Sequence, residues 1–330
     1  MSLSNSILPW QQKNWDSLYS YIKQGRIPQA LLITGTSGLG KHALANRFAT
    51  SLLCSNPQDN GAYCGVCNSC LLIKADTHPD LILIKPDEEK KSISINQIRQ
   101  VVTDTYLKPQ FDTHRVVIIN PADVMTAQAA NAFLKCLEEP TERTVFILIT
   151  DKPNKLSATI ISRCQKHSVN FPEKPMLYDW LREQGINDNQ ETLVNLLKSS
   201  ILKTQHLTNH DLLKQRTDCF NDWLTIAKHT NHPAIISEKW QKLPETELIN
   251  WLISWVVDLI KCTCRINREQ LCNQDLAKPL QELSQQLDLK GLYKWYDLLI
   301  NSRQRLGTQI NFQIMIEEIL VQWQELNGRT

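Results

Sequence analysis

The sequence predicts an α/β fold with a parallel sheet in the first half of the chain and an all-helical second half. Up to about residue 170, short apolar runs alternate with helical patterns, which is typical of a parallel sheet covered on both faces. The first run leads through a glycine-rich turn at residues 35–40 into a helix, as a phosphate-binding loop requires. From Phe171 onward we find helical periodicity broken by prolines and no convincing apolar strand.

The elements of the first half are predicted in chain order. Residues 1–29 carry apolar side chains at helical spacing and predict a packing helix before the first strand. Further helices are predicted directly after the glycine-rich turn, around residues 95–102 and at about residues 127–137. Continuous apolar runs predict four buried strands, at residues 30–34, 81–84, 115–119 and 144–149.

The second half is predicted to contain a small helical lid at residues 171–210 and a helical domain at residues 211–330. A polar stretch at residues 204–210 indicates the boundary between them. Apolar residues at 248–259 and at 312–323 form stripes with the spacing of a buried helix face. We interpret the aromatic residues of these stripes as the core of a helix bundle rather than as a cofactor site.

The glycine-rich turn matches three of the four specified positions of the GxxxxGK[ST] phosphate loop. Gly35, Gly38 and Gly40 allow backbone N–H groups to converge on an anion at a helix N-terminus, and Lys41 is placed to reach the outer phosphates. At the fourth position His42 replaces the Ser or Thr that would bind Mg²⁺, and an imidazole is a poor ligand for a cation that prefers oxygen. We therefore expect no Mg²⁺ here, and whether Lys41 still supports ATP binding stays open.

A second defect is predicted where the third strand ends. A phosphate-loop ATPase carries Asp-Glu after this strand, to support Mg²⁺ and to polarise the attacking water. This chain has Asn120 and Pro121 instead, and Asp123 lies too far beyond the strand for us to expect it to substitute. Because separate parts of one site are missing, we expect little or no ATP hydrolysis by the chain alone.

Four cysteines after the phosphate loop have the spacing of a metal site. Cys54, Cys64, Cys67 and Cys70 form C-x9-C-x2-C-x2-C, and four thiolates can close a tetrahedron around Zn²⁺. An iron–sulfur cluster is the competing interpretation, but the ferredoxin run needs another cysteine three residues on, followed by proline. Free buried thiols are the third possibility. We favour zinc, and with no open coordination position the site would be structural.

Composition limits the other classes of function. The 330 residues, of which 42% are hydrophobic, can bury a sizeable core, and the formal net charge of +2 does not suggest tight, non-specific nucleic-acid binding. The first ten residues lack a signal-peptide pattern and no run is long enough to span a bilayer, so we expect a cytoplasmic protein. The histidines are scattered, and we expect His78 to order the turn before its strand rather than to catalyse.

Several segments together resemble one family, the clamp-loader subunits of bacterial DNA polymerase III within the AAA+ class. The sequence NAFLKCLEEP at residues 131–140 is similar to a helix motif of the family, and Thr150 resembles its sensor threonine. Ser162-Arg163-Cys164 matches the SRC motif, and the four cysteines match the family's zinc module. The resemblance is specific over residues 26–171 and architectural beyond them.

The resemblance implies an AAA+-like module at residues 1–170 with a zinc insertion at 54–70, then the helical lid and a ring-forming collar at 211–330. It further implies a stator, a subunit with a degenerate nucleotide site that includes Asn120 and Thr150. Its Arg163 would reach the γ-phosphate held by a neighbour. The ATPases of the family carry a sensor arginine after Gly-Ser, and residues 197–201 here lack it.

The implied partners are the gamma or tau ATPase subunits and the delta subunit, with the sliding clamp and primed DNA reached through the complex. Two alternatives stay open. The chain could be an active clamp-loader ATPase of the gamma or tau type, or a zinc-dependent nucleic-acid-binding module with no motor role. ATP turnover by the isolated chain would favour the first alternative, and salt-sensitive DNA binding lost on chelation would favour the second.

Overall fold

A computed structural model describes residues 7–87, 91–111, 113–139, 141, 143–186, 190–197, 209–306 and 311–328. The chain divides into two compact units, Met1–Trp180 and Leu181–Thr330, and each is described by itself. The domain boundaries expected at residues 170 and 210 stay predictions. Most of the polar stretch at 204–210 lies outside the described residues, as does most of the segment 197–201 in which a sensor arginine is missing.

The first unit is built on a five-stranded sheet in which every pairing is parallel and the order is β2-β3-β4-β1-β5. The strands are β1 (Ala30–Thr34), β2 (Leu81–Ile84), β3 (Arg115–Ile119), β4 (Thr144–Thr150) and β5 (Gln165–Ser168). Apolar runs predicted the first four. The fifth is missing from the prediction because it lies at the sheet edge, where only His167 of its four residues is buried.

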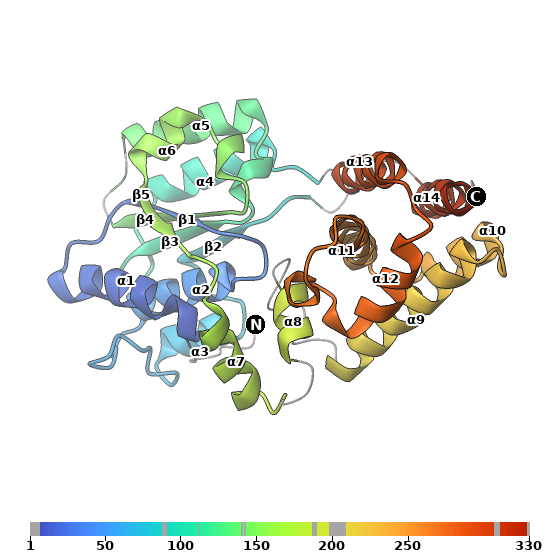
Figure 1. Cartoon of the computed structure of the whole chain (residues 1–330). Helices are drawn as coiled ribbons and strands as arrows, with labels where there is room; N and C mark the ends of the chain where they lie inside the picture. The colour runs from blue at the N-terminus through green and yellow to red at the C-terminus, as the bar shows by residue number, and fades with distance from the viewer. Residues whose placement is uncertain are drawn as a thin grey trace. The chain divides into compact units, whose positions relative to one another are not determined.

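Helices cover both faces of this sheet (Figure 1). One face shares a buried apolar cluster with α4 (Ile95–Tyr106), α5 (Ala127–Glu138) and α6 (Ala158–Arg163). Polar side chains begin these helices: Ser94 forms a capping box with Gln97, and Thr126 and Ser157 cap α5 and α6. The remaining helices that begin in the unit are α1 (Gln12–Gln24), α2 (Lys41–Leu53), α3 (Asn68–Lys74) and α7 (Lys174–Glu183), and α7 extends past its boundary at Trp180.

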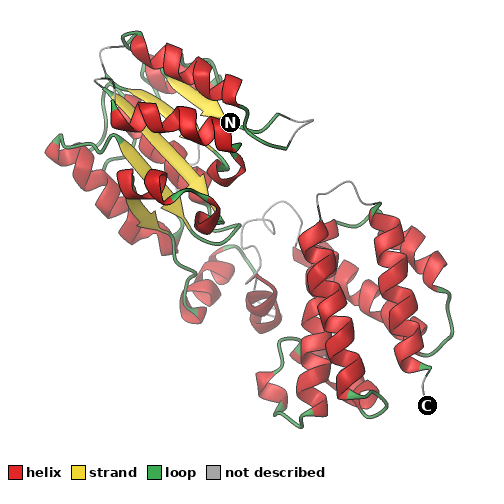
Figure 2. Cartoon of the chain, turned by 90° about the horizontal axis from the view of Figure 1, so that it is seen from above, coloured by secondary structure: helices red, strands yellow, loops and turns green. Residues whose placement is uncertain are grey.

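The described part of the second unit is helical (Figure 2). Its core includes six tryptophans, of which Trp223 and Trp323 stack with their ring centroids 4.2 Å apart. The apolar stripes of α11 (Glu245–Thr263) and α14 (Phe312–Asn327) line this core, which confirms the predicted helix-bundle interior. The helices are α8 (Gln190–Leu197), α9 (Asn209–Ala227), α10 (Pro233–Trp240), α11 (Glu245–Thr263), α12 (Ala277–Ser284), α13 (Leu289–Arg305) and α14 (Phe312–Asn327).

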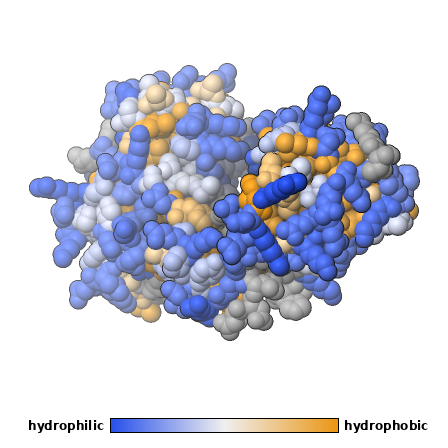
Figure 3. All heavy atoms as spheres, viewed as in Figure 1, coloured by the Kyte–Doolittle hydropathy of each residue, from blue (hydrophilic) through white to orange (hydrophobic). Residues whose placement is uncertain are grey.

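The surface is mixed. Polar residues cover most of the face drawn in Figure 3, and apolar residues gather in smaller areas on both units. Among the described residues, no helix combines the length and the apolar character that crossing a membrane demands.

Candidate functional site

The fold brings the predicted nucleotide residues to one edge of the sheet. Strands β1, β3 and β4 are adjacent and parallel, so their carboxyl ends lie together. Thr34 at the end of β1 pairs in register with Thr150 at the end of β4, and β3 ends one residue before Asn120. The loop after β1, Asn120 and Thr150 therefore surround one site, although they are far apart in the sequence.

The phosphate loop has the backbone conformation that its glycines permit. Gly38 and Gly40 both have φ of 78°, and Gly40 is the N-cap of α2. Gly35 has φ of 145°, and a Cβ atom there would lie 2.4 Å from the carbonyl oxygen of Val169. Any residue other than glycine would therefore be strained at these positions.

Two side chains from the N-terminal segment hold the loop from outside. The carbonyl of Leu39 accepts hydrogen bonds from Trp10 Nε1 at 3.1 Å and from Gln11 Nε2 at 2.7 Å. Both donors belong to a short 3-10 helix, Pro9–Gln11, and both are buried. These contacts within the protein stabilise the shape of the loop.

Lys41 is buried and already paired within the chain. Its Nζ lies 2.5 Å from Oδ1 of Asp151 and donates to the carbonyl of Thr36 at 2.6 Å. Sequence reasoning did not single out Asp151. Its position directly after Thr150 was the available signal, because the residue that follows β4 must lie at the same sheet edge as the loop.

The two residues predicted to stand in place of magnesium ligands contact each other. His42 Nδ1 lies 3.4 Å from the amide nitrogen of Asn120, and its Nε2 lies 3.1 Å from the amide nitrogen of Asn46. An amide can present either its nitrogen or its oxygen, so both nitrogens of a neutral ring can be satisfied. Burial, together with the positive charge of Lys85, lowers the pKa of His42 and keeps the ring neutral at pH 7.

Thr150, the predicted sensor threonine, forms hydrogen bonds inside the chain. Thr150 Oγ1 donates to Oδ1 of Asp123 at 2.6 Å and accepts from the backbone N–H of Lys152 at 2.9 Å. Asp123 was expected not to replace the missing acid, and in this structure its carboxylate is engaged by the threonine. The segment that carries Asp151 is held by the same contacts.

Arg163 is the last residue of α6 and lies near the surface. Its Nη2 is 2.8 Å from Oε1 of Glu138, and its Nη1 donates to the carbonyl of Thr159 at 3.1 Å. The side chains of Arg163 and Glu138 are 37% and 51% exposed. An ion pair this exposed contributes about 0–1 kcal/mol, so the guanidinium can leave it at small cost.

The four cysteines converge as a metal site requires. All four Sγ atoms lie within 4.8 Å of one another, with Cys54 and Cys67 3.9 Å apart and Cys64 and Cys70 4.0 Å apart. A tetrahedral zinc ion with Zn–S bonds of about 2.3 Å needs sulfurs about 3.8 Å apart. Sulfurs this close suit a single ion better than a cluster whose cysteines bind different iron atoms.

Backbone N–H groups favour thiolate formation within this cysteine cluster. The N–H of Cys64 points to Sγ of Cys54 at 3.3 Å, and those of Cys67 and Cys70 point to the preceding cysteine of the run. Burial opposes ionisation of Cys67, but hydrogen bonds led by the N–H of Cys70 lower its pKa to about 6. Burial raises the pKa of Cys54 and of Cys70, so a cation is needed to hold all four as thiolates.

Known proteins resemble this chain along almost all of its length. The family described as "DNA polymerase III, delta subunit" matches residues 10–173, and "DNA polymerase III, delta subunit, C terminal" matches residues 210–325. A DNA polymerase III subunit delta' from Pseudomonas aeruginosa is 32% identical over 98% of this chain and 98% of its own length. The chain belongs to the DNA polymerase III subunit delta' family. The delta' subunit of Escherichia coli is 28% identical over 95% of this chain and 94% of its own.

A solved structure supports the fold of this delta' family member. A DNA polymerase III, gamma subunit-related protein from Thermotoga maritima aligns with a TM-score of 0.51 and covers 95% of this chain and 99% of its own. At 18% identity this likeness shows the fold alone. The predicted fold class, a phosphate-loop-type parallel sheet followed by helices, is confirmed.

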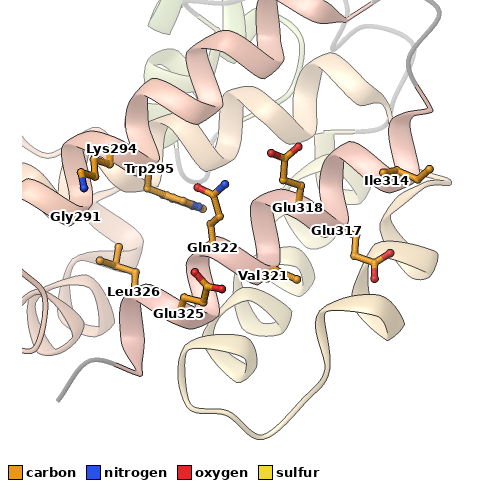
Figure 4. Close-up of a pocket in the computed structure, with 10 residues that line it drawn as sticks. All are labelled: Gly291, Lys294, Trp295, Ile314, Glu317, Glu318, Val321, Gln322, Glu325 and Leu326. Carbon is orange, nitrogen blue, oxygen red and sulfur yellow. The ribbon is translucent and has the colours of Figure 1, made fainter.

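The second unit of this delta' family member has a hollow of its own, of about 510 Å³, between α13 and α14 (Figure 4). It combines carboxylates with exposed apolar side chains, of which Ile314 is 65% exposed. The lining includes Trp295, Ile314, Glu317, Glu318, Val321 and Glu325.

Two smaller sequence predictions concern residues outside these sites. His78 Nδ1 accepts the backbone N–H of Asp80 at 3.1 Å, so the ring orders the turn before β2 as expected. The six cysteines outside the cluster, all among the described residues, form no disulfide bond in this structure.

Proposed function

We propose that this chain is the stator subunit of a clamp-loader complex that loads the sliding clamp onto primed DNA. Its partners would be the gamma or tau ATPase subunits and the delta subunit. Membership in the delta' family supports this proposal, because the relatives carry the name of that subunit. In this proposal residues 171–210 form the lid, and residues 211–330 form a collar that contacts neighbouring subunits.

The contact between His42 and Asn120 is the observation that carries the stator proposal. These two positions would hold Mg²⁺ in an active phosphate-loop ATPase, and here they offer a neutral ring and an amide to each other. Pro121 supplies no group that could polarise a water molecule. We infer that the chain does not hydrolyse ATP in its own site.

Arg163 would act on ATP held by a neighbouring subunit. A guanidinium presents fixed N–H donors that match phosphate oxygens, and it stabilises the charge that develops on the transferring phosphoryl group. The exposure of Arg163 and its weak pairing with Glu138 support this role, because both leave the side chain accessible to a partner. The four cysteines would hold one structural zinc ion in the same unit.

The arginine finger is tested with Arg163→Ala in the complex reconstituted with its ATPase and delta subunits. We expect hydrolysis at the site that receives Arg163 to fall on the order of a thousandfold, because a trans arginine contributes that much elsewhere. The measurement is ATP turnover stimulated by clamp and primed DNA. Thermal unfolding of the isolated variant should match that of the wild type, since the exposed pair stabilises little.

Lys166→Ala is the matched control, because Lys166 is an exposed cation of the adjoining strand β5. If Arg163→Ala left the ATP turnover of an intact complex unchanged, Arg163 would not act as an arginine finger. The active-ATPase alternative makes the opposite prediction for the isolated chain, namely steady ATP turnover that Lys41→Ala abolishes. Such turnover would replace the stator proposal.

A further inference from the structure

The charge that the phosphate loop would present to a phosphate is neutralised inside the chain. Lys41 is 5% exposed, and its ammonium group contacts the Asp151 carboxylate at 2.5 Å and the Thr36 carbonyl at 2.6 Å. Thr36 belongs to the glycine-rich loop, so the Lys41 side chain folds back and bonds to the backbone of that loop. Asp151 is 43% exposed and provides the negative charge.

The carboxylate of Asp151 lies on a segment that hydrogen bonds hold in place. Thr150 and Lys152 flank Asp151, and the hydroxyl of Thr150 donates to Asp123 while it accepts the N–H of Lys152. Strand β4 ends at Thr150, and its residues from Phe146 to Thr150 pair with β1, after which the loop begins. The pairing of these strands therefore places Asp151 against Lys41.

We propose that Asp151 is an internal anion that closes the phosphate loop to polyphosphates, and that the loop binds them without a metal ion once this carboxylate is neutralised. A polyphosphate must displace the carboxylate from Lys41 and then remain beside a second negative charge. Both steps oppose binding. The low effective dielectric around a buried lysine strengthens both the attraction between Lys41 and Asp151 and the repulsion between Asp151 and the polyphosphate. The positive φ angles of the glycines and the hydrogen bonds to the Leu39 carbonyl stabilise the loop conformation whether or not Asp151 carries a charge.

The test uses the full chain in magnesium-free buffer, with inorganic tripolyphosphate and then ATP as probes in isothermal titration. We expect Asp151→Asn and Asp151→Ala each to bind tripolyphosphate about tenfold more tightly than the wild type, because the competing carboxylate is gone. Adding Lys41→Ala to Asp151→Asn should abolish the gain. Asp16→Asn, an exposed site on α1, changes the net charge equally and should leave affinity unchanged.

Equal affinity of the wild type and both Asp151 variants would overturn the proposal, including the case in which none of them binds. A gain that survives Lys41→Ala would also overturn it, because the anion would then lie elsewhere. Thermal unfolding of each variant checks that the fold is kept. The proposal concerns the chain's own loop and does not rest on Arg163, so either result leaves the finger experiment independent.

Discussion

At the scale of single residues, the side chains of the predicted nucleotide site make contacts with one another and with the rest of the chain. His42 contacts Asn120, Lys41 pairs with Asp151, and Thr150 donates to Asp123. Each of these predicted nucleotide-site side chains therefore has a partner in the protein. A site satisfied in this way costs little stability when no nucleotide is bound, because few polar groups are left unpaired.

Gly35 of the loop gives a prediction about stability at this scale. Gly35→Ala should lower the free energy of unfolding by about 2–4 kcal/mol, because the backbone is strained for an L residue and the new Cβ would meet the Val169 carbonyl. Gly25→Ala is the matched control, since Gly25 also has positive φ but nothing lies within 4 Å of an added Cβ. It should cost only about 1 kcal/mol.

Urea unfolding of both variants measures the difference. Equal losses for Gly35→Ala and Gly25→Ala would show that the contact with Val169 has no cost of its own.

At the scale of elements, the cysteine cluster ties together pieces with little regular structure. Cys54 follows the last residue of α2, Cys67 is the N-cap of α3, and Cys70 lies in the first turn of α3. Between Cys54 and α3 the chain has no helix or strand. A metal ion would therefore fix a segment that hydrogen bonds alone hold weakly.

Removal of one ligand tests this role. Cys70→Ser should lower the zinc content below one ion per chain and lower the unfolding temperature of the first unit by at least about 5 °C. Cys264→Ser is the control, because Cys264 is an exposed thiol outside the cluster, and it should change neither quantity. Metal analysis and thermal unfolding give the two readouts. Full stability of a zinc-free Cys70→Ser chain would contradict a structural role.

At the scale of the whole molecule, we expect buried and half-buried histidines to make stability depend on pH. Burial is the largest cause that lowers the pKa of His42, His78, His114 and His167 below 6.5. In acid the unfolded chain then binds more protons than the folded one, so stability rises with pH. The contribution of these histidines to stability is fully present above about pH 6.5, the pKa of histidine in the unfolded chain. It is lost as the pH falls through the lower pKa values that these histidines have in the folded chain.

Urea unfolding at pH 7.5 and at pH 5.5 should therefore give a smaller free energy of unfolding at the lower pH. His167→Gln, at a buried ring that lies 3.4 Å from the Tyr21 hydroxyl, should reduce this difference because one of the titrating groups is gone. His229→Gln, at an exposed position, serves as the control. An unchanged difference in His167→Gln would mean that His167 does not contribute.

The sequence by itself determined the fold class, four of the five strands, the helical second unit and the family. These follow from local patterns: apolar runs, helical periodicity and motifs such as Ser162-Arg163-Cys164 each lie in one short stretch. The four cysteines were also grouped correctly, since their spacing is compact and the structure brings their sulfurs within 4.8 Å.

Only the tertiary structure decided how these pieces meet. Parallel pairing of β1 with β4 sets Asp151 against Lys41, and pairing of β3 with β4 brings Asn120 to His42, although 78 positions separate these two residues. The polar strand β5 is ordered by its pairing with β1 and not by its own composition. The physical reason is common to all three: a side chain's partner depends on strand order, which is set by burial of the whole sheet and not by neighbours in the chain.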